Sequence, residues 1–455
     1  MRDTLRSISL LSAFALTVSA TFSVPFKKEI NHSSVEKRHE TDAIANGLTL
    51  YNVDIQVGTP PQNLTVQFDT GSGSLWVFDV DANACKEQTC NGPLCKCYSH
   101  PTGQSIVASL IWGAVDPSKS STYEAITNES FFVGYLGSNV SGDWMADQFN
   151  IVGGVTLNAQ HMGLAFNGSQ NTPILGIGSS TDTENPSPLN NMVNQGHINN
   201  QAYSLYMDDI LDNSGQVIFG GVDVEKFMGT LMPLPVDSQH ILSVSMNTNG
   251  TDVSLIDQPD NAPRAILDTG AAYIDLPQTQ FQQFMSAIGA VETIEKGWVV
   301  DCDWNCNATD AFLTFTLGDN TTNAGPSRPV IKAPLSNLIF SSGSFDEAPW
   351  TNTCGIVVES TDDNSTTIFL GDGFLRNAYL VYDYTNLQIN LAQAVFETSS
   401  SNISEIPTGP LPTYVGQATG NTRLPQSYFS TCSASPSSTA SPNSTAATAA
   451  SPTSS

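Results

Sequence analysis

The sequence predicts a mostly β protein built from two similar lobes. Short alternating or β-branched runs, separated by Gly, Asn, Asp and Pro, dominate residues 48–394. A folded region of about 350 residues is too long for one ordinary core and suits two lobes of about 175 residues each. The triplet Asp-Thr-Gly also occurs once in each half, at 69–71 and 268–270, after an apolar run. Together these observations indicate a duplicated β lobe.

Residues 1–20 have the pattern of a cleaved secretory signal. Arg2 and Arg6 precede an apolar run at 8–18, and small residues follow it. This run is too short to cross a bilayer, and no later stretch reaches the roughly 20 apolar residues that a transmembrane helix needs. We therefore expect a secreted, extracellular protein with no membrane span.

Residues 21–38 are predicted to be a propeptide. This charged segment ends at the dibasic pair Lys37-Arg38, just before the first strand-like run. Such a pair is a cleavage site for processing proteases of the secretory pathway, although it also occurs as an ordinary surface pair. The N-terminal β lobe is then expected over residues 48–224 and the C-terminal β lobe over residues 225–397.

Helical periodicity is clear in one place only. Residues 280–290 carry apolar residues at i, i+3, i+4 and i+7, which form one core-facing stripe. Strand-like runs dominate elsewhere, which places the fold in the mostly β class. They include 51–57, 64–68, 131–135 and 216–219.

The C-terminal part of the chain changes composition at about Thr398, where Ser, Thr, Pro and Ala replace the apolar pattern. Such a segment cannot bury enough apolar surface to offset the entropy lost on ordering. We predict that residues 398–455 are a disordered, O-glycosylated tail whose deletion leaves any activity intact. Its polar end favours release, or retention at a cell wall through glycan or protein contacts.

Charge excludes some partners. The chain has 43 acidic and 16 basic residues, a net charge of −27, which is the opposite of what a nucleic-acid or anionic-membrane binder carries. We therefore expect no nucleic-acid partner. Few Lys and Arg also limit self-repulsion at low pH, which suits an acidic medium.

Cysteines and glycosylation sequons agree with life outside the cell. Eleven Asn-x-Ser/Thr sequons indicate N-glycosylation, and eight cysteines indicate disulfides. A zinc site in the first cysteine cluster is the alternative, but that cluster lacks paired C-x-x-C units. The disulfide candidates are Cys85, Cys90, Cys95, Cys97, Cys302 and Cys354, while Cys306 and Cys432 remain unassigned.

The two Asp-Thr-Gly triplets suit a site made of two carboxyl groups. In each triplet the Gly lets the backbone approach and donate N–H groups to the Asp, and the Thr hydroxyl can tie one loop to the other. Two carboxyl groups held together share one proton over a wide pH range. One carboxyl group, when ionised, would take a proton from water, while the other, protonated, would polarise a carbonyl. The alternative is two ordinary β-turns.

Residues 48–394 resemble the pepsin-like aspartic proteases. The resemblance rests on Val-Gly-Thr-Pro-Pro-Gln at 57–62, Phe-Asp-Thr-Gly-Ser-Gly-Ser-Leu-Trp-Val at 68–77, Phe-Gly-Gly-Val-Asp at 219–223, Ile-Leu-Asp-Thr-Gly at 266–270 and Leu-Gly-Asp-Gly-Phe-Leu-Arg at 370–376. It implies a two-lobed pepsin-like acid protease fold with the active-site cleft between the lobes. It also implies a monomeric endopeptidase that acts on protein or peptide substrates without a cofactor or metal.

Site residues follow from the resemblance. Asp69 and Asp268 are then the catalytic pair, supported by Thr70, Gly71, Ser72, Thr269 and Gly270. A flap tyrosine that meets the indole of Trp76 falls at Tyr135, and Gly137 belongs to the flap turn. Cys302 and Cys354 bracket a disulfide loop in the second lobe.

Three departures from the family pattern stand out. The flap has Tyr-Leu-Gly-Ser-Asn at 135–139 in place of Tyr-Gly-x-Gly-Ser/Thr, and a glycan at Asn139 would crowd the cleft. Ala271 stands where the family usually has Ser or Thr, so Asp268 lacks a hydroxyl neighbour and is expected to be the more easily protonated member. A Cys-rich insertion also occupies about 84–111.

Two other functions are open on the sequence alone. One is a pepsin-fold binding or inhibitor protein that has lost catalysis, and the other is a structural wall glycoprotein. Both triplets survive, which favours the enzyme, while the tail and the sequons concern location more than activity.

Overall fold

The computed structural model describes residues 21–29, 50–83, 112–135, 137–170, 172–180, 182, 184–208, 214–236, 239–248, 250–258, 261–293, 297–302, 311–319, 328–343, 350 and 353–422. Within these ranges the chain is mostly β, and the predicted fold class, a two-lobed pepsin-like fold, is confirmed. No helix in the described ranges is long and apolar enough to cross a bilayer.

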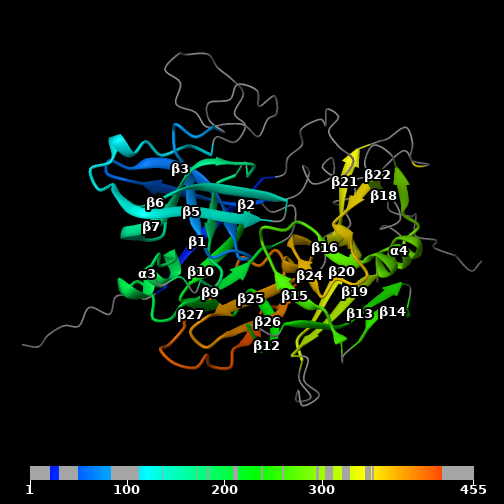
Figure 1. Ribbon diagram of the computed structural model, residues 1–455. Helices are drawn as coiled ribbons and strands as arrows, with labels where there is room; N and C mark the ends of the chain where they lie inside the picture. The colour runs from blue at the N-terminus through cyan, green and yellow to red at the C-terminus, as the bar shows by residue number, and fades with distance from the viewer. Residues whose placement is uncertain are drawn as a thin grey trace, which may run out of the picture.

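The first lobe is a set of strands around the hairpin of β5 and β6 (Figure 1). Its strand interiors alternate between buried and exposed side chains, as expected when one face of a sheet covers a core. The strands are β2 (Leu50–Val57), β3 (Gln62–Asp69), β4 (Leu75–Phe78), β5 (Glu124–Tyr135), β6 (Ser138–Ile151), β7 (Thr156–Gly168) and β8 (Ile174–Gly176), with the short helices η1 (Pro117–Lys119) and α3 (Pro188–Asn194).

The second lobe contains an eight-stranded sheet and a separate four-stranded sheet, counted over the described residues. The first comprises β13 (His240–Thr248), β14 (Thr251–Asp257), β15 (Arg264–Leu267), β16 (Ile274–Pro277), β19 (Phe312–Gly318), β20 (Val330–Pro334), β23 (Val358–Thr361) and β24 (Thr367–Leu370). The second comprises β17 (Val291–Thr293), β18 (Gly297–Asp301), β21 (Ile339–Gly343) and β22 (Thr353–Ile356), and the helices are α4 (Gln278–Ala287), η3 (Leu335–Leu338) and α6 (Asp372–Leu375).

Helix α4 is the helix that the sequence predicts at 280–290, but it starts two residues and ends three residues earlier, at Gln278–Ala287. Phe281, Phe284 and Met285 are buried as expected from their spacing. The helix ends early because Gly289 has φ +69°, a left-handed conformation that stops helices and that glycine adopts without strain.

Strands from both halves meet in a continuous sheet beneath the lobes. Its order across the middle is β12–β26–β25–β9–β10–β1–β2, so strands from distant parts of the chain become neighbours. The side chains of β9 and β25 are buried throughout, including those of the polar residues Ser204 and Asp383. The bounds are β1 (Phe22–Glu29), β9 (Ala202–Tyr206), β10 (Ser214–Phe219), β12 (Phe227–Pro235), β25 (Ala378–Asp383) and β26 (Gln388–Ala394).

The start of the predicted propeptide is an integral part of this sheet. Strand β1 lies antiparallel to β10 on one side and to β2 on the other, with Phe22 opposite Phe219. Val24 is buried in the main core. The dibasic pair Lys37-Arg38 and the predicted signal segment lie outside the described residues.

The predicted disordered tail begins too early. Residues 398–422, which we call the C-terminal strap, pack on the fold, whereas residues 423–455 lie outside the described ranges. The strap contributes β27 (Ile403–Glu405), which pairs with β11 (Gly221–Asp223), and β28 (Val415–Gln417), which pairs with β12. Backbone pairing satisfies the polar main chain of this Ser- and Pro-rich segment, an effect that composition does not reveal.

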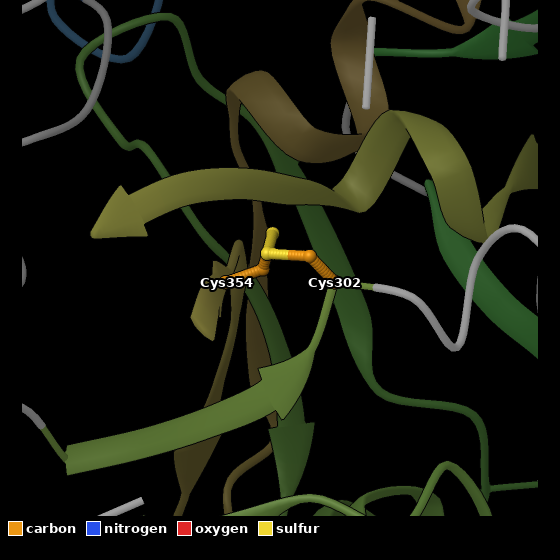
Figure 2. The surroundings of a disulfide bond; sticks show 2 residues. All are labelled: Cys302 and Cys354. Carbon is orange, nitrogen blue, oxygen red and sulfur yellow. A yellow bond between two sulfur atoms is a disulfide. The ribbon is translucent and has the colours of Figure 1, made fainter. Parts of the chain in front are cut away.

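One disulfide lies within the described residues. Cys302 and Cys354 are joined, with 5.1 Å between their Cα atoms, which is the pairing implied by the family resemblance (Figure 2). The bond connects the end of β18 to β22, the strand beside it. The candidates Cys85, Cys90, Cys95 and Cys97 lie outside the described residues.

Candidate active site

The two Asp-Thr-Gly triplets occupy equivalent places in the two lobes. Asp69 ends β3, which pairs in parallel with β8, and β15 ends at Leu267, beside the parallel strand β24. Each triplet is therefore the turn that follows a central strand whose neighbour also runs parallel to it. The internal repeat in the sequence corresponds to this repeated local structure.

Threonine side chains join the two turns by four hydrogen bonds. The N–H of Thr70 donates to the Thr269 hydroxyl oxygen at 3.0 Å, and the N–H of Thr269 donates to the Thr70 hydroxyl oxygen at 3.0 Å. Each hydroxyl in turn donates across the junction, Thr70 to the Leu267 carbonyl at 2.9 Å and Thr269 to the Phe68 carbonyl at 2.7 Å. Both threonines are buried, so these bonds hold the two turns in a fixed relation.

The carboxyl groups of Asp69 and Asp268 face each other across this junction. The N–H of Gly71 donates to Asp69 Oδ1 at 2.8 Å, and the N–H of Gly270 donates to Asp268 Oδ1 at 2.7 Å. A Cβ atom on Gly71 would lie 2.5 Å from the Asp268 carboxyl carbon, and one on Gly270 would lie 3.0 Å from Asp69 Oδ1. Each glycine thus leaves room for the opposite carboxyl group.

The environments of the two carboxyl groups differ. Asp69 is 5% exposed and accepts a second hydrogen bond from the Ser72 hydroxyl at 2.5 Å. At the corresponding place beside Asp268 stands Ala271, which offers no hydroxyl. Burial raises the pKa of Asp268, and the negative charge of Asp69 raises it further, against the opposing effect of the Gly270 and Gly71 N–H groups. Asp268 therefore holds a proton at pH values where an ordinary Asp is ionised.

The hairpin of β5 and β6 brings Tyr135 to this site. The indole N–H of Trp76 donates to the Tyr135 hydroxyl oxygen at 2.8 Å. Burial raises the pKa of Tyr135 well above its ordinary value, so the phenol keeps its proton. Gly137 lies in the hairpin turn with φ +79°, exposed and with open space around it, so it does not join the other residues at the carboxyl pair.

Sequence reasoning missed a buried ion pair behind the site. Asp372, at the start of α6, pairs with Arg376 one turn later and accepts a hydrogen bond from the Tyr51 hydroxyl. Both charged side chains are at most 1% exposed. The spacing of four residues between Asp372 and Arg376 was a local signal, whereas Tyr51 is 321 residues away from Asp372 and left none.

A second missed group supports the end of β15. The Tyr382 hydroxyl donates to the Leu267 carbonyl at 3.0 Å, the same carbonyl that accepts from Thr70. Its ring stacks on that of Tyr203 with 4.9 Å between centroids. These tyrosines fill the space under the triplets from the central sheet.

Metal ligands do not gather at this site or elsewhere in the described ranges, where no group of three His, Cys, Asp or Glu side chains could hold a metal ion. The first cysteine cluster, for which zinc was the alternative, lies outside those ranges.

Comparison with known proteins gives a consistent picture. The sequence model of the family described as eukaryotic aspartyl protease matches residues 50–394. The probable aspartic-type endopeptidase opsB of Aspergillus oryzae is 30% identical over 386 residues, which cover 80% of this chain and 72% of the relative.

Two yeast proteins are similarly close. Secreted aspartic protease 3 of Candida albicans is 32% identical over 388 residues, covering 83% of this chain and 88% of the relative. Aspartic proteinase yapsin-3 of Saccharomyces cerevisiae is 28% identical over 418 residues, covering 84% of this chain and 74% of the relative. The match to the family model, residues 50–394, includes both Asp-Thr-Gly triplets.

Proposed function

We propose that Asp69 and Asp268 are the catalytic pair of this chain. The chain belongs to the eukaryotic aspartyl protease family and is an aspartic endopeptidase. The observation that carries the proposal is the approach of the two carboxyl groups across the threonine-linked turns. Two carboxyl groups that are close enough to hydrogen-bond to each other keep one proton between them, which provides a base and an acid at the same site. The aspartic protease pair is a well-known example of this effect.

Asp69 is the ionised member of the proposed pair. It has two donors, the Gly71 N–H and the Ser72 hydroxyl, and both stabilise negative charge. Asp268, whose pKa is raised, carries the proton. This assignment makes Asp69 the general base toward water and Asp268 the general acid toward the scissile carbonyl.

The proposed reaction has two steps. Asp69 removes a proton from water, the water oxygen bonds to the carbonyl carbon, and Asp268 gives its proton to the carbonyl oxygen, which forms a tetrahedral diol. Asp69 then gives its new proton to the amide nitrogen while Asp268 takes one back from a diol hydroxyl, and the C–N bond breaks. Carboxylic acid and amine leave, and the pair again holds one proton.

Tyr135 is the proposed flap residue over this pair. Because its phenol keeps its proton and is fixed by the Trp76 N–H, it presents a rigid polar group from the β5–β6 hairpin to a bound peptide. A hairpin that closes over substrate keeps bulk water from the reacting groups. Protein and peptide chains are the proposed substrates, and the enzyme acts as a monomer.

An extracellular location is also proposed. The signal-like residues 1–20 support it, and one relative bears the name secreted aspartic protease 3. Fractionation of cells that express the full chain tests it: activity is expected in the medium or at the cell wall, and activity confined to the cytoplasm would contradict it.

The test of the catalytic pair uses Asp69→Asn and Asp268→Asn. Each substitution removes one ionisable group, so cleavage of a casein-type protein at roughly pH 3–6 should fall by at least about 10²–10⁴-fold. A statine-type transition-state mimic should inhibit the unchanged enzyme. Asp257→Asn is the matched control, since Asp257 is an exposed carboxyl at the end of β14 and the substitution creates no glycosylation sequon. Full activity of either Asn variant at the pair would refute the assignment.

A further inference from the structure

The flap hairpin has two faces of different character. Phe131, Val133 and Tyr135 on β5 alternate toward the lobe, where they pack around Trp76 together with Val140 of β6. In this hairpin Val133 is opposite Val140 and Gly134 is opposite Asn139. Since side chains alternate along a strand, the remaining residues point to the outer face of the hairpin, away from the carboxyl pair.

The outer face carries an exposed aromatic ring beside an open space. Phe132 is 67% exposed, the highest value among the large apolar side chains of the described residues. Next to it Gly134 has no side chain, and a Cβ atom there would meet only the Phe132 ring, at 4.0 Å. The Phe132 ring therefore borders an open space over Gly134.

Asn139 stands at the edge of this area. It is exposed, and within the described part of the chain its side-chain amide makes no hydrogen bond. Its backbone is fixed, because its carbonyl accepts from the Ser169 N–H at 2.9 Å and its N–H donates to the Ser169 hydroxyl at 3.2 Å. Asn139 and Phe132 are diagonal neighbours across the hairpin, a relation that places side chains about 7–8 Å apart and within reach of long groups.

Residues 139–141 read Asn-Val-Ser, an acceptor for an N-linked glycan. We propose that Asn139 is glycosylated and that the first sugar of its glycan lies over Gly134 against the ring of Phe132. The apolar C–H face of a pyranose ring fits an aromatic face, and the sugar amide and hydroxyl groups stay in water. The glycan thereby shields the exposed ring and ties β6 to β5 on the outer face of the flap.

This geometry corrects the expectation that a glycan at Asn139 crowds the cleft. Tyr135 lies on the inner face of the hairpin, where it is bonded to Trp76 of β4, whereas Asn139 belongs to the opposite face. A glycan there leaves the approach to the carboxyl pair open. Its effect is on the stability of the hairpin that covers the site.

The first test measures occupancy. The full chain is secreted from a eukaryotic host, digested, and treated with peptide N-glycosidase in heavy-oxygen water, which converts a glycosylated Asn to a labelled Asp. The peptide that contains Asn139 should carry the label, and Asn139→Gln and Ser141→Ala should each remove one glycan from the intact mass. An unlabelled Asn139 peptide would overturn the proposal.

The second test measures the contact. Amide hydrogen exchange of residues 130–141 should become about 2- to 12-fold faster in Asn139→Gln and in Phe132→Ser, with no further increase in the double variant, because both changes remove the same contact. Asn63→Gln is the matched control: Asn63 is an exposed sequon residue of the same lobe, and its amide oxygen already accepts from Gln56 at 2.9 Å. Its exchange in the hairpin should match the unchanged enzyme. Unchanged exchange in Asn139→Gln, or additive effects in the double variant, would refute the contact.

Discussion

At the scale of single residues, the two candidate catalytic carboxyl groups differ by one neighbour. Ser72 donates its hydroxyl to Asp69, whereas Ala271 takes the corresponding place beside Asp268. Burial and the charge of Asp69 raise the pKa of Asp268, and Ala271 adds nothing that would lower it. The two carboxyl groups therefore differ both in the residue that follows each triplet and in their surroundings in the fold.

A hydroxyl at position 271 should change the pH dependence of cleavage. In Ala271→Thr the new donor stabilises ionised Asp268 by about 1.5–3 kcal/mol, which lowers its pKa by about one to two units. Activity requires the proton on Asp268, so the upper limb of the pH–rate profile should move to lower pH by a similar amount. Ala271→Val is the control, because valine has nearly the same shape as threonine without the hydroxyl. An equal movement of both profiles would mean that volume, and not the hydrogen bond, is responsible.

At the scale of elements, two strands next to the site carry a second pair of carboxyl groups. Asp275 of β16 and Glu359 of β23 are directly opposite each other in parallel register, and Asp275 also accepts from the Phe369 N–H at 3.1 Å. Burial raises the pKa of Asp275. The Glu359 side chain is exposed as a whole, but partial burial of its carboxyl group and the charge of Asp275 raise the pKa of Glu359 to about 7. The strands are thus best paired when this carboxyl pair retains a proton.

The pair should make stability depend on pH. A carboxyl group with a raised pKa binds protons more readily in the folded than in the unfolded chain, so the free energy of unfolding falls as pH rises from the ordinary value of 4.5 to about 7. Glu359→Gln removes this loss and should raise the urea midpoint at pH 7 to 8 relative to the unchanged protein, with little effect at pH 4. Glu292→Gln, at an exposed site on β17, should change neither. An equal midpoint of Glu359→Gln and the unchanged protein at pH 8 would contradict the prediction.

Helix α6 contains a buried ion pair, whose loss should destabilise the protein more than the loss of a surface ion pair. Asp372→Ala leaves the Arg376 charge buried without its partner, which should cost about 3–5 kcal/mol in the free energy of unfolding. Lys119→Ala breaks an ion pair with Asp116 whose lysine side chain is 66% exposed, and should cost at most about 1 kcal/mol. Urea unfolding of the two variants measures the difference, and similar losses would show that burial does not set the strength of the Asp372 pair.

At the scale of the whole molecule, the C-terminal strap connects the two halves. Asp223, at the end of the first half, accepts from the Ser401 hydroxyl at 2.7 Å and the Asn402 N–H at 2.8 Å. Further along, β28 pairs with β12, and Asn337 donates to the Thr422 carbonyl at 3.1 Å. The strap lies beyond residues 50–394, which match the family model, yet it forms part of the fold.

Two truncations should distinguish the contribution of the strap to stability from that of the residues that follow it. A chain that ends at Thr422 should keep its activity and its urea midpoint. A chain that ends at Glu397 loses the buried side chain of Ile406, which alone contributes about 1.5–3 kcal/mol, and leaves Asp223 without these two donors. Its midpoint should fall clearly. Equal midpoints for the two truncations would restore the prediction of a dispensable tail from Thr398.

The sequence alone determined the β class, the duplication and helix α4, because these depend on local periodicity and on short motifs that repeat. It also singled out Asp69, Asp268, Tyr135 and Trp76, since each lies within or can be counted from a motif. It placed the beginning of the tail wrongly because strap stability comes from pairing with strands far away in the chain.

Only the tertiary structure decided how distant groups combine. The crossed bonds of Thr70 and Thr269 join residues 199 positions apart, and Tyr51 reaches Asp372 across 321 positions. The inequality of Asp69 and Asp268 depends on how deeply each carboxyl is buried and on how closely the two approach, and neither quantity is a property of local sequence. Local chemistry therefore pointed to the proposed catalytic residues, whereas packing between the lobes raised the pKa of Asp268.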